Sequence, residues 1–218
     1  MRVLIACEFS GRVRDAFALL NHDAWSCDLM HSETPGQHIR GDVLTVLDNQ
    51  WDLMIAHPPC TYLAASGARW WRNKQTEQRA ALDFAMKLLN APIPRIALEN
   101  PIGRLGSYIT ATQIIQPYYF GHPESKATCL WLKNLPKLIP TSNMSALTIM
   151  KPKAHYVPPG PLRQQQRSRT YPGVATAMAQ QWSNLIKWDY YDVWSTFPRS
   201  RCGSYLIDQA PHRGSLVY

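Results

Sequence analysis

Two short apolar segments of the chain each run directly into residues that could do chemistry. The first segment leads into His57-Pro58-Pro59-Cys60, and the second leads into Glu99-Asn100-Pro101. A cysteine thiol can act as a nucleophile, and a carboxyl group can act as an acid. Residues just past the carboxyl ends of strands line the ligand crevice of an open α/β sheet. The sequence therefore predicts that Cys60 and Glu99 meet in such a crevice and carry out covalent catalysis with acid assistance.

The elements that would position these two motifs alternate between strand and helix patterns over the first hundred residues. Short apolar segments predict strands at residues 3–7, 24–29, 51–56 and 96–98. Apolar residues at helical spacing predict helices at residues 12–20 and 76–89, with a short helical turn at 43–47. This alternation indicates right-handed βαβ units, so we expect an α/β fold with a mostly parallel sheet and helices on both faces.

The second half of the chain has a different pattern. Residues 113–120 and 127–132 predict two strands around the turn Gly121-His122-Pro123-Glu124, which indicates a C-terminal hairpin. Residues 171–188 follow a helical pattern, and residues 142–166 read as an extended loop. We accordingly divide the chain into a catalytic core at 1–141, a short loop insert at 142–166, a returning helix of the core at 167–188 and an irregular tail at 189–218.

The composition narrows the classes of protein that fit. Of the 218 residues, 45% are hydrophobic and 17% are charged, which excludes a disordered or coiled-coil protein. No apolar stretch approaches the roughly 20 residues of a membrane span. The first apolar segment is too short for a secretory signal, so we expect it to be the first strand. The five cysteines are scattered without a Cys-x-x-Cys pair, which favours the reducing cytoplasm and argues against a zinc site or any other metal.

In their order along the chain, several motifs resemble the conserved blocks of the DNA cytosine-5 methyltransferases. Pro58-Pro59-Cys60 is similar to the block that carries the nucleophile, and Glu99-Asn100-Pro101 resembles the Glu-Asn-Val block. Other segments are similar to further blocks of that family, at residues 7–11, 27–29, 41–43, 66–69, 119–124 and 173–182. The resemblance covers residues 1 to about 186. It implies a Rossmann-like S-adenosylmethionine-dependent methyltransferase fold and the activity of a DNA (cytosine-5-)-methyltransferase.

The resemblance also implies a role for each part of the site. Cys60 would add to carbon 6 of cytosine, and Glu99 would stabilise the adduct through N3 and the exocyclic amine. Carbon 5 would then take a methyl group from S-adenosylmethionine. The residues expected to bind this cofactor are Phe9, Gly11, Asp28, Asp42 and Pro59. A free thiol is mostly protonated at neutral pH, so we expect Arg69 or a helix N-terminus to lower the pKa of Cys60.

The chain departs from the family pattern in several places. Glu124 and Lys126 stand where the eighth block has a glutamine and its first arginine. Thr128 stands where that block has the arginine that contacts the base, so Arg167 or Arg169 would take over this catalytic role. The first block keeps one glycine, and Val174 replaces the asparagine of the last block. The large target-recognition domain of the family is missing, and residues 142–166 occupy its place.

The net charge of +8 favours DNA as a partner, although a basic surface that keeps a protein soluble would give the same value. Arg69-Trp70-Trp71-Arg72-Asn73-Lys74 combines charges for phosphates with indoles for stacking on bases. We expect Arg69, Arg72, Lys74 and Lys126 to bind DNA. An exposed helix start with aromatic residues packed on the core is the alternative. A second basic cluster, at 151–169, could equally be a solvated loop. His57 is read as a histidine with a satisfied hydrogen bond, and orientation of the cofactor or of the base is the alternative role.

Three other functions stay open at this point. An amino-group methyltransferase fits poorly, because His57-Pro58-Pro59-Cys60 lacks both the acidic or amide residue and the aromatic residue of such sites. A related enzyme could add another group to cytosine or act on a free nucleotide. A catalytically silent DNA-binding module of the same fold is the third alternative. The small size is typical of a phage or mobile element, so we expect the protein to act in the cytoplasm of a bacterial or phage-infected cell.

Overall fold

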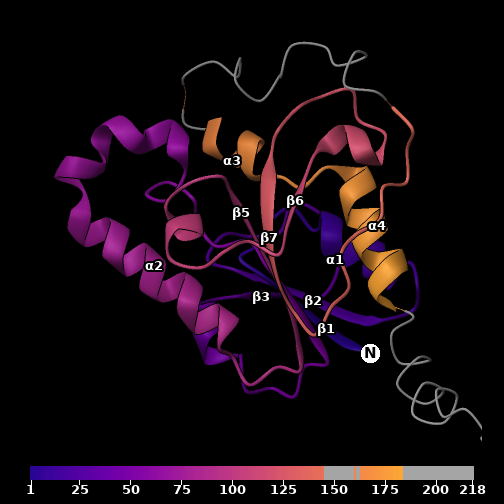
Figure 1. The fold of residues 1–218 in the computed structure, drawn as a ribbon. Coiled ribbons are helices and arrows are strands. Elements are labelled where there is room, and N and C mark those ends of the chain that lie inside the picture. Colours follow the sequence, from indigo (N-terminus) through magenta and orange to yellow (C-terminus); the bar gives the residue numbers. More distant parts are fainter. Residues whose placement is uncertain (145–159, 161–162, 184–218) are drawn as a thin grey trace, which may run out of the picture. The chain divides into compact units, whose positions relative to one another are not determined.

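A seven-stranded sheet organises the part of the chain that the structure, a computed structural model, describes (Figure 1). The described residues are 1–144, 160 and 163–183, and they belong to one unit, Met1–Leu185. The strand order is β3-β2-β1-β4-β5-β7-β6. The strands are β1 Arg2–Ala6, β2 Asp23–Asp28, β3 His38–Arg40, β4 Leu53–Ala56, β5 Arg95–Pro101, β6 Gln113–Ile115 and β7 Thr128–Lys133.

The pairing of these strands fixes the class of fold. Strands β1 to β5 pair in parallel, and β7 runs antiparallel to both of its neighbours, β5 and β6. The chain order reverses between β1 and β4, which is the switch point where ligands bind in open α/β sheets. A sheet of this order with a single reversed strand has the Rossmann-like methyltransferase topology. The predicted fold class is confirmed.

Helices cover both faces of the sheet (Figure 1). Successive side chains of the central strands belong to two hydrophobic cores, one on each face of the sheet. Helix α2, Gln75–Leu89, packs on one face, whereas α1, Arg12–Ala18, and α4, Pro172–Ser183, pack together on the other. In β1, Leu4 belongs to the α2 side and Ile5 to the α1–α4 side, because successive side chains of a strand point to opposite faces. Both are completely buried, as expected for a parallel strand covered by helices.

The second half differs from the predicted elements in detail. The first strand of the hairpin ends at Ile115, and a 3-10 helix over Pro117–Phe120 follows, because Pro117 has no N–H for a ladder and suits the first turn of a helix. β6 and β7 still pair as an antiparallel hairpin. Residues 163–166, expected in the loop insert, belong to a short helix, α3, Arg163–Ser168. The rest of that predicted loop is mostly outside the described residues, as is the predicted tail at 189–218, and the domain boundaries stay predictions.

Short 3-10 helices lie between the longer elements. Three more 3-10 helices lie at Val43–Thr45, Ala65–Asn73 and Arg104–Ser107, the first of them at the predicted helical turn. Within the described ranges, none of the helices has the length and apolar character needed to cross a membrane. The same ranges contain no group of three His, Cys, Asp or Glu side chains that could hold a metal ion.

Candidate active site

The register between β4 and β5 brings the two predicted motifs side by side. Ala56 pairs with Leu98, so His57 and Glu99 are the next residues along two neighbouring parallel strands. The Pro58-Pro59-Cys60 turn follows immediately. Both motifs therefore lie at the carboxyl edge of the sheet, where the sequence predicted that they would meet.

A hydrogen bond of 2.6 Å joins His57 Nδ1 and Glu99 Oε2. Burial alone would lower the pKa of His57, but the hydrogen bond to Glu99, the charge of Glu99 and that of Glu8 outweigh it and raise this pKa. Burial would raise the pKa of Glu99, and the bond to His57 together with the charges of His57 and Lys126 lowers it instead. The pair is therefore an imidazolium–carboxylate pair over the range between these two pKa values. The sequence marked His57 as a hydrogen-bonding residue without identifying its partner.

The turn that carries Cys60 is held on both sides. The buried side-chain amide of Asn100 donates to the carbonyl of Pro58 at 3.0 Å. The backbone N–H groups of Leu63 and Ala64 donate to the carbonyl of Cys60 at 3.0 and 2.9 Å. The position of the half-buried thiol is therefore fixed by the residue that follows Glu99 as well as by its own loop.

The electrostatic environment of Cys60 differs from the expectation. Burial raises the pKa of the thiol, the positive charge of Lys126 lowers it, Glu99 raises it, and the charge of Arg167 lowers it to a smaller extent. The net pKa is raised, whereas the sequence predicted a lowered one. The cations that act on the thiol are Lys126 and Arg167, and Arg69 is not among them.

Lys126 lies inside this site. Its Nζ donates to the backbone carbonyl of Arg167 at 2.8 Å and lies 5.8 Å from the centre of the Tyr171 ring. Its charge acts on Cys60, Glu99 and His57. The sequence proposed Lys126 for DNA binding from its place in the eighth block. Its contacts with the catalytic candidates could not be read from that motif.

The two arginines proposed to replace the missing base contact have different surroundings. Arg167 contributes to the field at Cys60. Arg169 makes two hydrogen bonds to the carboxylate of Glu33, at 2.9 and 2.6 Å. Of the two, Arg167 is therefore the better placed for catalysis, and Arg169 ties its segment to the loop between β2 and β3.

A small pocket opens beside Glu99. Its walls include Glu99 from β5, Thr128 from β7, Lys126 just before β7, and Thr170 and Tyr171 from the segment that leads into α4. One carboxylate and one ammonium group therefore face a cavity whose other walls are hydroxyl-bearing or apolar.

Four of the five residues proposed for the cofactor, Phe9, Gly11, Asp28 and Asp42, lie at or just beyond the carboxyl ends of β1, β2 and β3, and Pro59 follows β4. Asp28 Oδ1 accepts from the N–H of Met30 at 2.9 Å, and Asp42 Oδ1 accepts from the N–H of Leu44 at 3.0 Å. Burial, followed by the negative charges of Asp28, Cys27 and Asp42, raises the pKa of the Cys7 thiol. The two aspartates are therefore close enough to act on one residue at the end of β1. Two aspartates therefore lie at the carboxyl ends of β2 and β3, whereas two cations, Lys126 and Arg167, act on Cys60 beyond the carboxyl end of β4.

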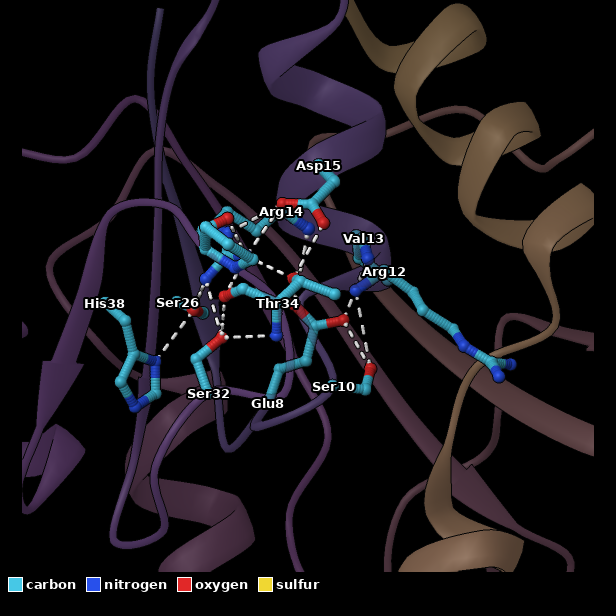
Figure 2. Close-up of polar contacts among 11 residues, drawn as sticks. Glu8, Ser10, Arg12, Val13, Arg14, Asp15, Ser26, Ser32, Thr34 and His38 are labelled. Atoms are coloured by element: carbon cyan, nitrogen blue, oxygen red, sulfur yellow. Dashed lines mark hydrogen bonds and ion pairs between the residues drawn. The ribbon is translucent and has the colours of Figure 1, made fainter.

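The turn from β1 into α1 is filled by Glu8 (Figure 2). Its buried carboxylate accepts from the backbone N–H groups of Val13 at 2.8 Å and Arg14 at 3.2 Å, and from the Ser10 hydroxyl at 3.1 Å. Helix N-termini at this place in nucleotide-binding folds bind phosphate. Here the chain's own carboxylate takes the amide donors, so the turn does not suit a phosphate-bearing cofactor. The sequence analysis did not single out Glu8.

Phe9 and Gly11, the two cofactor candidates in this turn, are tightly packed. Gly11 has φ 72°, and a Cβ there would overlap the side chains of Thr34 and Arg14, so glycine is required for packing. Phe9 is buried and its carbonyl accepts from Glu33 N–H at 2.8 Å, whereas Pro59 is exposed. The cofactor roles of these three residues stay predictions.

A buried guanidinium holds the loop between β2 and β3 (Figure 2). Arg14 is 1% exposed and donates to the hydroxyls of Ser26, Ser32 and Thr34 and to the carbonyls of Thr34 and Pro35, and it pairs with Asp15. A buried charge is tolerated when its donors are paired in this way. Helical spacing alone gave no sign that Arg14 would be internal.

The predicted DNA-binding segment forms the 3-10 helix Ala65–Asn73. Arg69, Arg72 and Lys74 are exposed, and Lys74 Nζ lies 3.1 Å from a Glu77 carboxylate oxygen. The Trp71 ring is half-buried, and the Arg104 guanidinium lies 6.0 Å from its centre. The charges thus face solvent, as DNA binding requires, while Trp71 packs against the protein, as the alternative expected. Lys151 and Lys153 of the second cluster lie outside the described residues.

Comparison with known proteins adds little to this geometry. No protein-family model and no curated protein matches the chain. Among solved structures, the chain is similar to a proposed DNA modification methyltransferase encoded within a prophage (E. coli), with a TM-score of 0.39 and 12% sequence identity. The match covers 60% of this chain and 45% of that one, so the chain spans less than half of that protein. The fold is assigned from the strand order, and the function has to be argued from the site.

Proposed function

We propose that the protein methylates carbon 5 of cytosine in DNA, with S-adenosylmethionine as the methyl donor and Cys60 as the covalent nucleophile. The observation that carries this proposal is the placement of a thiol and a half-buried carboxylate at the ends of two neighbouring parallel strands, with Lys126 close enough for its charge to act on both. Packing of the sheet needs neither a cysteine nor a glutamate at these positions.

The chemistry of cytosine explains why both groups are needed. Carbon 5 is too weak a nucleophile to attack a methyl sulfonium group directly. Addition of Cys60 Sγ to carbon 6 breaks the aromaticity of the ring and makes carbon 5 nucleophilic. Glu99 stabilises the adduct through N3 and the exocyclic amine, and acid assistance of this kind is worth about 10²–10⁴ in rate.

The thiol has to be deprotonated for this attack. Because burial raises the pKa of Cys60 above its usual range, the protein alone holds the thiol form at neutral pH. Lys126 and Arg167 supply the positive field that favours the thiolate as it forms. Deprotonation therefore accompanies attack on the base, and either cation is expected to support it.

The residues at the carboxyl ends of β1 to β3 fit the proposed cofactor. S-adenosylmethionine has no phosphate, and Glu8 occupies the amide donors that a phosphate would need. Asp28 and Asp42 offer carboxylates to ribose hydroxyls and to an adenine amine, and their negative charge suits a cationic ligand. The bound cofactor supplies an electrophilic methyl group. The protein's part is to hold it in line with the base that Cys60 has activated.

The test is the base composition of DNA from cells that express the protein, measured by mass spectrometry. We expect 5-methylcytosine with the wild type and with Cys129→Ala, which removes a thiol on β7, and none with Cys60→Ser. A different cytosine modification would retain the covalent step and replace the methyl group. Modified nucleotides in the soluble pool alone would make the substrate a free nucleotide. Unmodified DNA and nucleotides with the folded wild-type protein would contradict the proposal and favour a silent module.

A further inference from the structure

The residue before the Pro-Pro-Cys turn occupies a fixed position between several charges. His57 N–H donates to the carbonyl of Ala6 at 2.9 Å, which continues the β1–β4 pairing by one residue. Pro58 follows, and it restricts the backbone of His57 to extended conformations. The imidazole is consequently anchored by its main chain and does not depend on a flexible loop for its position.

The ring makes one short polar contact and leaves its other nitrogen without a partner. Nδ1 lies 2.6 Å from Glu99 Oε2, and the side chains of His57 and Glu99 are 10% and 17% exposed. His57 Nε2 is buried and has no hydrogen-bond partner among the described residues. A histidine that served only packing would be expected to pair both nitrogens or expose one. The geometry therefore favours a functional role for Nδ1 of His57, through its contact with Glu99.

The charges that face His57 come from three elements. Glu99 lies on β5, Glu8 lies at the turn after β1, and Lys126 lies before β7, with the Cys60 thiol in the same loop as His57. Glu8 is fixed by two backbone N–H groups of α1 and presents a second negative charge to the ring. Two carboxylates against one ammonium group favour a proton on the imidazole, and the contact with Glu99 lets that proton move between two heavy atoms.

We propose that His57 is a positioning residue that acts through Glu99, orienting its carboxyl group and storing on Nδ1 the proton that Glu99 delivers to N3 of the base. This inference rests on the proposed function. As the bond between Cys60 Sγ and carbon 6 forms, the thiol proton leaves to solvent and the C5–C6 electron pair moves toward N3. The Nδ1 proton of His57 passes to Glu99 and from Glu99 to N3, which leaves a neutral imidazole and a carboxylate. When the carbon–sulfur bond breaks, the N3 proton returns to the pair, the proton of carbon 5 leaves to solvent, and the released Cys60 thiolate takes a proton from solvent.

The first test measures proton storage without any substrate. The imidazole of His57 is titrated by NMR in the wild type and in Glu99→Gln, with His22 as an internal reference at the opposite edge of the sheet. We expect His57 to titrate above the ordinary histidine range in the wild type and to fall by one unit or more in Glu99→Gln, while His22 stays unchanged. A His57 that titrates at or below the ordinary range, or that ignores Glu99→Gln, overturns the proposal.

The second test separates proton delivery from a structural role. His57→Asn keeps an amide donor close to the position of Nδ1 but holds no transferable proton. At neutral pH it should form the covalent adduct with 5-fluorocytosine DNA about 10²-fold more slowly than the wild type, the lower end of the usual value for acid assistance. The wild-type to variant ratio should shrink as the pH falls toward the range where Glu99 takes a proton from solvent. His22→Asn should match the wild type throughout.

A loss in His57→Asn that is the same at every pH would mean that His57 is merely structural. A wild type that forms no adduct at any pH, with the NMR result as expected, would contradict the proposed function and the transfer step. In that outcome the NMR titration would still support the shared proton between His57 and Glu99.

Discussion

At the scale of single residues, the site depends on the mutual charge states of His57 and Glu99. The raised pKa of His57 stabilises the fold below its ordinary value of 6.5, and this contribution is lost as the pH rises through the folded-state pKa. The lowered pKa of Glu99 stabilises the fold above its ordinary value of 4.5, and this contribution is lost as the pH falls through its folded-state pKa. Both contributions are complete between about pH 4.5 and 6.5.

We therefore expect Glu99→Gln to cost the most stability within that window, about 1.5–3 kcal/mol for a hydrogen bond to a charged group. The cost should shrink toward higher and lower pH. Chemical denaturation of wild type and variant across pH 3–9 measures it, with Glu77→Gln, an exposed carboxylate on α2, as the control. A cost that does not change with pH would mean that the pair is not ionised in the folded protein.

Part of this residue-scale picture could be predicted from the sequence. Cys60 and Glu99 each follow an apolar strand, so their common edge follows from the parallel arrangement alone. The His57–Glu99 contact depends on the register of two strands separated by a long helix, which local patterns do not encode. Glu8 and Arg14 were missed for a related reason, because charged residues are predicted at the surface unless their partners are known.

At the scale of elements, the candidate catalytic residues and the candidate cofactor residues lie at the carboxyl ends of different strands. The ends of β4 and β5 carry the thiol and the carboxylate, and the ends of β1, β2 and β3 carry the acidic residues proposed for the cofactor. The mostly parallel sheet with helices on both faces was predicted from the alternating strands and helices, since crossovers are right-handed, whereas the strand order was not. β3 has three residues and was missed, because so short a strand has no apolar pattern of its own.

The cofactor proposal is tested at this scale. Asp42→Ala should weaken S-adenosylmethionine binding by about 1–3 kcal/mol, since it leaves buried polar groups of the ligand unpaired. Isothermal titration calorimetry measures this change, and Asp28→Ala should behave similarly. Asp48→Ala, beyond the 3-10 helix that Asp42 caps, serves as the control. Unchanged binding in both Asp28→Ala and Asp42→Ala would remove the basis for placing the cofactor here.

At the scale of the whole molecule, we expect the net charge of +8 to govern the proposed interaction with DNA. The exposed cations of the 3-10 helix Ala65–Asn73 and of Lys74 are separate from Lys126 and Arg167, which act on the thiol. Charge-based binding and catalysis should therefore respond to different substitutions. The sequence could predict the first set, because a basic aromatic cluster is local, but the second set required the fold.

Each phosphate that the protein neutralises should add about 0.9 to the slope of log affinity against log salt concentration. Replacing Arg69, Arg72 and Lys74 together by alanine should lower that slope and weaken binding about equally on unrelated sequences. Lys74 should contribute least, because it already pairs with Glu77. Fluorescence anisotropy at several salt concentrations measures the slope, with Arg95→Ala, at the start of β5, as a charge control. An unchanged slope would place the DNA elsewhere on the surface.

Covalent catalysis through Cys60 can be observed in the mass of a trapped complex. The wild type is incubated with S-adenosylmethionine and DNA that carries 5-fluorocytosine, denatured and measured by intact mass spectrometry with peptide mapping. We expect a denaturation-resistant adduct joined at Cys60, formed equally by Cys129→Ala and not at all by Cys60→Ser. An adduct at another cysteine, or none with folded wild-type protein that binds both ligands, would contradict it.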